Sequence, residues 1–331
     1  MSPARAARPA RPVVLVTRRL PGPVEEQLGR EFDARLNPDD HAFSGAELST
    51  ALGSADALVP TVTDRLSATV LAAQPLRTRI LANYGAGFNH IDTAAAKTRG
   101  LVVTNTPDVL TDDTADAAVM LMLMVARRAG EGERQVRAGA WTGWRPTHML
   151  GTRVSGKTLG LIGLGRIGRA VAQRARHGFG MRVVFHDPYP PPPSVVAELG
   201  AEPRASVDDV VREADFVSIH SPATPDTRHL IDARRLTLMK PGAFLINTAR
   251  GDIVDEAALV AALQRKVIAG TALDVYEREP EVTRNLLAME QVVLLPHLGS
   301  ATSETRVAMG LRVLENLRAF FAGVPPRDRV V

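Results

Sequence analysis

Apolar runs with strand character alternate with helix-like stretches along nearly the whole chain, and this alternation constrains the fold more than any other feature of the sequence. The second half shows it most clearly, in runs that read TLGLIG, RVVFHD, DFVSIH, AFLINTAR, AGTALDVY and VVLLPH. The first half carries shorter runs, PVVLVT, ADALVP, TRILAN and LVVTNT. Strands that are each followed by a helix assemble into a parallel sheet with helices on its faces. The sequence therefore predicts an α/β protein.

The chain has 331 residues, of which 45% are hydrophobic, and is long enough for about two domains with a core each. Its most apolar run, AAVMLMLMVA at 117–126, is about half as long as a membrane span, which needs about 20 residues. We expect a buried helix there and no membrane partner. Asp112, Asp113 and Asp116 precede the run, where acids in a first turn suit the helix dipole without any metal. No metal site is predicted.

The charge pattern does not favour a nucleic-acid partner. Four of the 40 basic residues are lysine and the rest arginine, but they are dispersed among 36 acids and the formal net charge is only +4. The absence of cysteine excludes disulfides and thiolate chemistry and suits a reducing cytoplasm, where we expect the protein to lie. The segment 1–12 has three arginines and no acid, but its prolines oppose the amphipathic helix of a transit peptide. We expect a disordered tail.

The six apolar runs of the second half all end in a residue suited to ligand binding. These residues are Gly163, Asp187, His220, Arg250, Asp274 and His297. In open parallel sheets, ligands bind outside the carboxyl ends of the strands. The shared position predicts that these residues lie around one site.

The segment TLGLIGLGRIG resembles a dinucleotide-binding fingerprint, with Gly163, Gly165 and Gly168 between a strand and a helix. The first glycine permits a tight turn, the second lets the backbone approach a pyrophosphate, and the third allows close packing of the helix, whose N-terminal amides attract phosphate. Asp187 follows 19 residues after Gly168 and can accept hydrogen bonds from ribose hydroxyls while repelling a 2′-phosphate. We therefore expect NAD(H) to be preferred over NADP(H). The alternative is that Asp187 only caps the turn before Pro188.

The remaining strand ends supply the groups that carbonyl reduction needs. Reduction places negative charge on the carbonyl oxygen, which then requires a proton donor and a nearby positive charge. His297 can donate the proton, and Arg250 can hold carbonyl and carboxylate oxygens through parallel hydrogen bonds. Glu279 can accept the other imidazole hydrogen and favour the imidazolium form. The alternatives are a structural histidine bonded to a backbone carbonyl, a surface arginine, and a solvated loop pair of Glu277 and Glu279.

Together these residues resemble the D-isomer-specific 2-hydroxyacid dehydrogenase family. The family segments GLGRIG, NTARGDIVDEAAL, ALDVYEREP and LPHLGSAT are all present and in order. The resemblance implies that Arg250 orients the substrate, that Glu279 partners the histidine, that His297 is the acid/base, and that Asp274 meets the nicotinamide carboxamide. It also implies a set of positions that line the cofactor: Arg166, Ile167, Ser221, Pro222, Thr227, Thr248 and Ala249.

The segment NYGAGFNHID matches the glycine-rich substrate loop of the same family. Closely spaced glycines let the backbone amides of Ala86 and Gly87 point at a carboxylate and form an anion nest that needs no side chain. The alternative is a plain turn between a strand and a helix. We expect His90 to be a core or capping histidine.

Within the family, VTRRLP, TPDVLTDDTAD, WTGWRP and GSAT are most similar to glyoxylate and hydroxypyruvate reductases. The resemblance implies two doubly wound parallel-sheet domains, with a Rossmann NAD-binding domain at 106–299 inserted into a flavodoxin-like substrate domain at 1–105 and 300–331. It also implies a homodimer, in which the helix and arm after Thr111 embrace the partner and Trp144 closes the neighbouring active site. The alternative for Trp144 is a core or interface aromatic without substrate contact.

We therefore expect reduction of a small 2-keto acid, glyoxylate or hydroxypyruvate, by NADH. A related enzyme acting on phosphoglycerate is the first alternative, although no additional cationic groups for a phosphate are evident. The second alternative is an NAD-sensing, corepressor-like protein, because the same fold can serve binding in place of catalysis.

Overall fold

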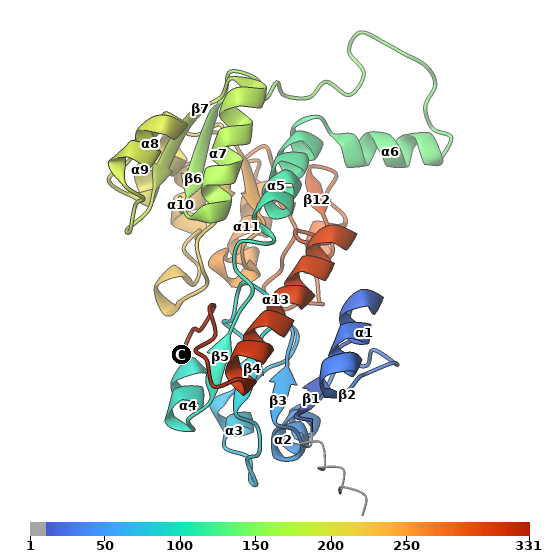
Figure 1. Cartoon of the computed structure of the whole chain (residues 1–331). Helices are drawn as coiled ribbons and strands as arrows, with labels where there is room; N and C mark the ends of the chain where they lie inside the picture. The colour runs from blue at the N-terminus through green and yellow to red at the C-terminus, as the bar shows by residue number, and fades with distance from the viewer. Residues whose placement is uncertain (1–10) are drawn as a thin grey trace, which may run out of the picture. The chain divides into compact units, whose positions relative to one another are not determined.

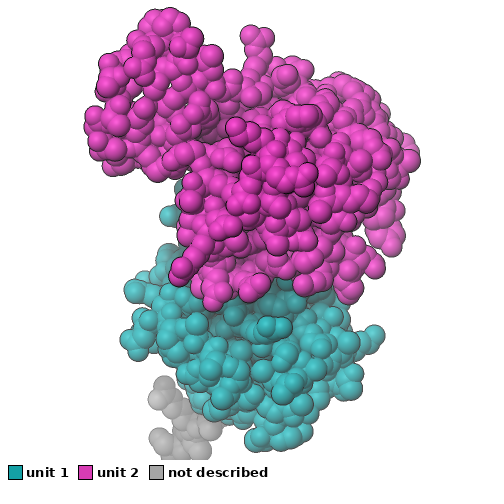
Figure 2. Space-filling model, turned by 180° about the vertical axis from the view of Figure 1, so that it is seen from behind, with its two compact units in different colours: residues 1–110, 302–331 teal, residues 111–301 magenta. Residues whose placement is uncertain are grey.

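The computed structural model describes residues 11–331, so nearly all of the expected tail lies outside the described residues. The chain forms two compact units, which Figure 2 shows in different colours. Unit 1 comprises the described residues up to Leu110 together with Thr302–Val331, and unit 2 comprises Thr111–Ala301. One unit is thus inserted into the other. The inserted unit spans residues 111–301 in the structure, whereas the sequence predicted that it spans residues 106–299.

Unit 1 is built on a parallel five-stranded sheet with the order β2-β1-β3-β4-β5. Its strands are β1 (Val13–Val16), β2 (Asp33–Arg35), β3 (Ala57–Val59), β4 (Ile80–Ala82) and β5 (Val102–Thr104). This is the flavodoxin-like order, in which the chain starts in the interior of the sheet and winds outward in both directions. The flavodoxin-like prediction is confirmed.

The helices of unit 1 are α1 (Gly22–Glu31), α2 (Gly45–Ser54), α3 (Ala68–Leu71), α4 (Thr93–Thr98) and α13 (Ser303–Phe321). Leucines of α2 and α3, including Leu48 and Leu71, pack with strand residues such as Leu58 and Leu81 in one core cluster. Helices α1 and α13 pack against each other so closely that a Cβ at Gly310 would lie 2.4 Å from Val24. The last segment of the chain therefore completes this unit.

Unit 2 is built on a parallel seven-stranded sheet with the order β12-β11-β10-β9-β6-β7-β8. Its strands are β6 (Thr158–Ile162), β7 (Arg182–His186), β8 (Ala201–Pro203), β9 (Phe216–Ile219), β10 (Phe244–Asn247), β11 (Gly270–Leu273) and β12 (Val292–Leu294). Counted from β6, this is the dinucleotide-binding order 3-2-1-4-5-6, extended by one strand at an edge. The predicted Rossmann domain is confirmed.

Two helices of unit 2 precede its first strand, and its other helical segments follow or connect the strands (Figure 1). The helical segments are α5 (Thr111–Ala126), α6 (Ala129–Arg137), α7 (Arg166–Phe179), α8 (Pro193–Leu199), α9 (Val207–Glu213), α10 (Ala233–Leu238), α11 (Glu256–Gln264) and α12 (Arg284–Leu287), with the 3-10 turns η1 (Pro225–Thr227) and η2 (Gly251–Ile253).

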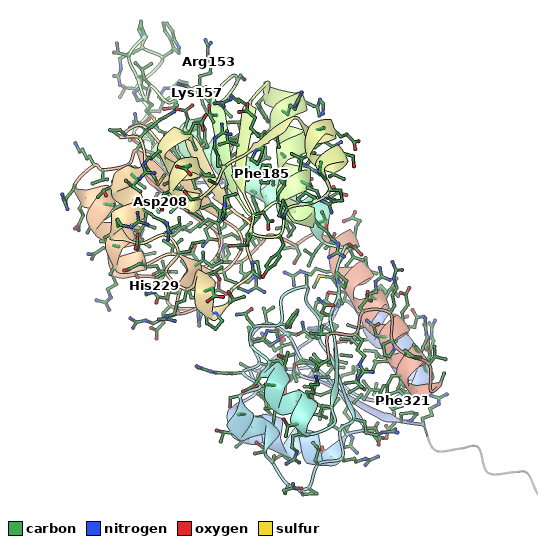
Figure 3. All side chains as sticks on the ribbon, turned by 90° about the vertical axis from the view of Figure 1, so that its left-hand side faces the viewer. Arg153, Lys157, Phe185, Asp208, His229 and Phe321 are labelled. Atoms are coloured by element: carbon green, nitrogen blue, oxygen red, sulfur yellow. The ribbon has the colours of Figure 1, made fainter. Side chains whose placement is uncertain are left out.

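The strands of unit 2 are apolar on both faces, as a sheet covered on both sides requires. Phe216 and Phe244 stack with ring centroids 5.3 Å apart and belong to the core under α5 and α7, as does Phe185, which Figure 3 labels. Their neighbours Val217 and Leu245 belong to a second core cluster under α9, α10 and α11. Side chains that alternate between two covered faces produce the continuous apolar runs seen in the sequence.

Helix α5 corresponds to the predicted buried helix at 117–126. The acids of α5 do more than complement a helix dipole, because Asp112 in the first turn and Asp116 one turn later both accept hydrogen bonds from Arg174 of α7, at 3.0 and 2.5 Å. Within residues 11–331 no helix combines the length and apolar character needed to cross a membrane. The same described residues contain no cluster of three or more histidine, aspartate or glutamate side chains suited to a metal ion.

After α5, the chain forms α6 and then a long loop that projects from the rest of unit 2 before it enters β6 (Figure 1). We call residues 127–153 the arm. Most of its large apolar side chains are exposed: Val136 (61%), Trp141 (54%), Trp144 (81%) and Leu150 (67%). A local hydrogen bond of 2.9 Å from His148 to Gln135 ties the loop back to α6.

Candidate active site

The residues at the ends of the apolar runs lie along one edge of the unit 2 sheet. All of its strands are parallel, so their carboxyl ends meet at that edge. Gly163, Asp187, His220 and Asp274 directly follow β6, β7, β9 and β11, whereas Arg250 and His297 follow β10 and β12 by three residues. The cofactor-lining positions assigned from the family lie in the same connections. These are Arg166 and Ile167 in α7, Ser221, Pro222 and Thr227 after β9, and Thr248 and Ala249 after β10.

The glycine fingerprint has the steric features that a dinucleotide requires. Gly163 has φ +95°, and a Cβ there would lie 2.8 Å from the His220 carbonyl oxygen. A Cβ at Gly168 would lie 2.3 Å from the Gly163 carbonyl oxygen, so both positions exclude a side chain. By contrast, a Cβ at Gly165 would meet nothing within 4 Å. Gly165 therefore faces open space at the N-terminus of α7, where no side chain caps the helix amides and an anion can be bound.

Two buried hydroxyls at the same edge also fit a polar ligand. Ser221 Oγ and Thr248 Oγ1 are buried and have no hydrogen-bond partner among the described residues. Buried hydroxyls are normally satisfied, so unpaired ones call for a partner that the protein chain does not supply. Asn247 shapes the turn that carries Thr248, because its side chain accepts a hydrogen bond from Ala249 N (3.0 Å) and donates one to Arg250 O (2.8 Å).

Asp187 caps a turn, as the alternative from the sequence held, and its carboxylate also holds the fingerprint loop. Its Oδ1 accepts a hydrogen bond from Tyr189 N at 2.8 Å, which caps the turn around Pro188. Its Oδ2 accepts one from Leu164 N at 2.7 Å and so fastens the fingerprint loop to the end of β7. A carboxylate has about four acceptor positions, and these two bonds leave capacity for ligand hydroxyls.

His297 and Glu279 form a direct pair, with 2.8 Å between His297 Nδ1 and Glu279 Oε2. Because an ionised carboxylate only accepts hydrogen bonds, Nδ1 carries a hydrogen and Nε2 is the atom that can gain or lose a proton. Glu279 Oε1 is held by the Tyr276 amide at 3.0 Å. Burial acts to raise the pKa of Glu279, but the hydrogen bond and charge of His297 oppose it, and this pKa lies below its ordinary value. The partner of the histidine therefore stays ionised.

The backbone of His297 is left-handed, with φ +56°, a conformation that non-glycine residues rarely adopt. Asp274 holds it there. The Asp274 carbonyl accepts from His297 N (2.9 Å), while its two carboxylate oxygens accept from Leu298 N (2.6 Å) and Gly299 N (2.7 Å). Burial raises the pKa of Asp274 despite these bonds. The structure thus gives Asp274 a structural task in the histidine turn, which the sequence did not reveal.

Arg250 lies beside this pair, close enough for its charge to interact with that of Glu279. Burial lowers the pKa of Arg250, and the charges of Glu279 and Asp252 counteract this effect. The next residue, Gly251, packs directly on the other loop, since a Cβ there would lie 1.9 Å from the Tyr276 carbonyl carbon. Only glycine lets the turn that carries Arg250 meet the segment that leads to Glu279.

Several polar residues that support these loops were not identified from the sequence. Glu256, at the start of α11 and only 6% exposed, accepts hydrogen bonds from Glu277 N (2.7 Å) and Thr283 Oγ1 (2.6 Å), which lie on either side of Glu279 in its loop. His229, which Figure 3 labels, contacts Glu277 Oε1 through Nε2 at 2.8 Å. Glu277 and Glu279 are therefore not a pair of acids without protein partners, because each contacts its own histidine, although Glu279 is exposed.

His220 differs from the other strand-end residues. Its ring contacts Ser218 Oγ at 2.8 Å, and burial lowers its pKa to about 4. It is therefore neutral at ordinary pH. Its backbone closes against Gly163, so this histidine contributes shape to the fingerprint loop.

The remaining predicted residues belong to other segments of the chain. Ala86 and Gly87 are in unit 1, in the partly exposed loop between β4 and α4. In the same loop, His90 Nε2 contacts Asn83 Oδ1 at 2.9 Å. Trp144 lies on the arm and is 81% exposed.

Comparisons with known proteins agree with this arrangement. A family model described as "D-isomer specific 2-hydroxyacid dehydrogenase, NAD binding domain" matches residues 119–299. The chain is 45% identical over 321 residues to a glyoxylate reductase of Thermococcus kodakarensis, covering 96% of this chain and 95% of the relative. A glyoxylate reductase of Aeropyrum pernix is also 45% identical, over 322 residues and with the same coverage.

A solved structure is similar over the same extent. It is described as an NADPH-dependent glyoxylate/hydroxypyruvate reductase from Sinorhizobium meliloti in complex with NADP and malonate. It matches with a TM-score of 0.86 and 35% identity, and the match covers 97% of each chain. The chain therefore belongs to the D-isomer-specific 2-hydroxyacid dehydrogenase family.

Proposed function

We propose that this chain reduces small 2-keto acids, such as glyoxylate and hydroxypyruvate, to 2-hydroxy acids with NADH. The observation that carries the proposal is the 2.8 Å pair of His297 and Glu279, beside Arg250 and on the sheet edge that also bears the glycine fingerprint. The glyoxylate reductases that are 45% identical to this chain support the substrate class, and the Sinorhizobium relative extends it to hydroxypyruvate.

Each catalytic side chain has a separate task in this proposal. His297 Nε2 donates the proton that the carbonyl oxygen takes up, and Glu279 stabilises the imidazolium form before the transfer. Arg250 binds the keto and carboxylate oxygens through parallel hydrogen bonds and stabilises the charge that develops on the carbonyl oxygen. The amides of Ala86 and Gly87 bind the substrate carboxylate.

The cofactor, when bound, supplies the hydride. The residues that would hold it fit a dinucleotide, since Gly165 leaves space at the N-terminus of α7 and the hydroxyls of Ser221 and Thr248 lack partners among the described residues. We propose that Asp187 would bind the ribose hydroxyls and that Asp274 would bind the nicotinamide carboxamide. The Sinorhizobium relative is described as NADPH-dependent, so our preference for NADH rests on the Asp187 carboxylate of this chain.

We further propose that the chain forms a homodimer through α5 and the arm, which contains α6. Four large apolar side chains of the arm are more than half exposed, and this concentration of exposed apolar side chains in one segment favours an interface. Trp144, at 81% exposure, has little contact within its own chain. We assign it to the active site of the neighbouring subunit.

Initial rates of NADH oxidation after addition of keto acids test the proposed function. We expect glyoxylate and hydroxypyruvate to be reduced, with one hydroxy acid formed for each NADH consumed. A preference for a phosphorylated keto acid would favour a phosphoglycerate-type enzyme. Tight NADH binding without oxidation by any of these acids would contradict catalysis and favour a dinucleotide-sensing binding protein.

A further inference from the structure

We infer that the side-chain amides of Asn83 and Asn105 position the backbone of residues 85–87 for carboxylate binding. The inference rests on the proposed function, because it concerns the loop assigned to the substrate carboxylate. It adds two positioning residues that act through the peptide groups of the loop without touching the substrate.

The carbonyl oxygens of this loop are all occupied by donors from the protein. Asn83 Nδ2 donates to Gly85 O at 2.9 Å and to Gly87 O at 3.0 Å. Asn105 Nδ2 donates to Ala86 O, which lies between them, at 2.8 Å. The backbone amide of Thr106 also donates to Gly85 O at 3.0 Å. Three consecutive carbonyls are thus held by two side-chain amides and one backbone amide.

Both asparagines are themselves held in place. Asn83 is fully buried, and its Oδ1 contacts His90 Nε2 at 2.9 Å. Because Nδ2 of Asn83 is already used as the donor, His90 Nε2 must carry the hydrogen in this contact. His90 therefore serves to orient the amide of Asn83. Asn105 is held through its backbone, since its N–H donates to Asp328 O (3.2 Å) and its carbonyl oxygen accepts from Asn316 Nδ2 (3.3 Å).

Fixing the carbonyls also fixes the amides, because each peptide group is planar and its N–H points opposite to its C=O. The N–H groups of Ala86 and Gly87 donate to no acceptor within residues 11–331, and both residues are partly exposed. Successive free amides in a tight loop form a concave site for an anion. Two adjacent amides suit a carboxylate, which can accept two hydrogen bonds at once.

Substitutions at Asn105 test the inference, because this residue is only half-buried. Asn105→Ala removes the donor to Ala86 O, and Asn105→Asp replaces it with an acceptor that repels this carbonyl. Both changes should raise the KM for glyoxylate at least tenfold and alter kcat about threefold or less, as expected when uniform binding of the substrate is lost. Asn37→Ala is the matched control. Asn37 also holds two backbone carbonyls of unit 1, those of Thr17 and His41, at 2.8 Å each.

A binding measurement separates this inference from the proposed function. We would titrate oxamate, an unreactive carboxylate that resembles a 2-keto acid, into NADH-saturated enzyme by calorimetry. Both Asn105 variants should bind oxamate at least tenfold more weakly than wild type, while Asn37→Ala and the affinity for NADH stay unchanged. The inference is overturned if both variants bind oxamate normally, or if only Asn105→Asp is impaired, since charge alone would explain that result. If oxamate binding depended on Asn105 but no keto acid were reduced, the inference would stand and the proposed function would fall.

Discussion

At the scale of single residues, the acid/base candidate is held in an uncommon conformation. The left-handed backbone of His297 costs roughly 1–2 kcal/mol in a non-glycine residue, and the three hydrogen bonds from 297–299 to Asp274 oppose that cost. Such a backbone persists only where its surroundings enforce it. The position of the imidazole is therefore set by the main chain as well as by Glu279.

The charge of Glu279 should determine where the reductive activity is lost as pH rises. Reduction requires protonated His297, so kcat/KM for the keto acid falls with increasing pH. The pKa of Glu279 is lowered, so its carboxylate remains ionised over the pH range in which this activity falls, and it favours the imidazolium form. Glu279→Gln removes that charge, and we expect the falling limb to move to lower pH. A pH series of kcat/KM on both proteins measures the displacement. An unmoved limb would show that the carboxylate does not influence the titrating group.

The Asp187 carboxylate should set the cofactor preference. It lies at the end of β7, and no arginine follows it in the segment HDPYPPPP, so a 2′-phosphate would meet negative charge without compensation. We expect kcat/KM to favour NADH over NADPH at least tenfold, which corresponds to about 1.4 kcal/mol. Initial rates with each cofactor at saturating glyoxylate provide the ratio. An equal or reversed preference would contradict this role of Asp187.

The sequence indicated residues whose types suggest chemistry, but not the residues that support them. Glu279 and His297 were expected to pair, and the structure brings them together. Glu256 was not identified, because an acid in the first turn of a helix ordinarily serves the helix dipole. Its bonds to Glu277 and Thr283 depend on how α11 packs against a loop more than 20 residues away. No local pattern encodes such a contact.

At the scale of elements, the loop that carries Glu279 is anchored by α11. Glu256→Ala would remove the acceptor for Glu277 N and Thr283 Oγ1, on either side of Glu279, and leaving such buried donors unpaired costs about 1–3 kcal/mol each. We expect kcat to fall about tenfold and the melting temperature to drop. Glu256→Gln is the conservative control, since the hydroxyl of Thr283 can rotate to accept from an amide. If Glu256→Ala retained wild-type kcat with a lowered melting temperature, the residue would be structural only.

Strand prediction succeeded for every interior strand of both sheets and for the apolar edge strands β5 and β12, and it failed at the other two edges. The ten apolar runs correspond to β1, β3–β7 and β9–β12, which are buried between helices. The two strands that were missed, β2 (Asp33–Arg35) and β8 (Ala201–Pro203), lie at sheet edges and are three residues long. An edge strand is partly solvated, so its sequence need not be apolar. The order of the strands was implied by the family resemblance, since apolar periodicity carries no information about it.

At the scale of the whole molecule, the proposed homodimer rests on the exposed apolar side chains of the arm. If Trp144 completes the partner's site, a mixed dimer of one Trp144→Ala subunit and one Arg250→Ala subunit has one site with both lesions and one with neither. We expect about half of the wild-type activity in mixed dimers isolated with two affinity tags, and little in either mutant homodimer. If confirmed mixed dimers recovered no activity, Trp144 would act in the active site of its own subunit.

The central claim is that His297 delivers the proton that keto-acid reduction consumes, and a pH series in both reaction directions tests it most directly. Oxidation of the hydroxy acid needs the neutral imidazole, so its kcat/KM should rise with pH over the range in which that of reduction falls. His297→Ala should lower kcat about a hundredfold or more and flatten both profiles, with NADH binding retained as evidence of folding. Near-normal turnover in His297→Ala, with both profiles unchanged, would contradict the account and leave His297 a structural residue.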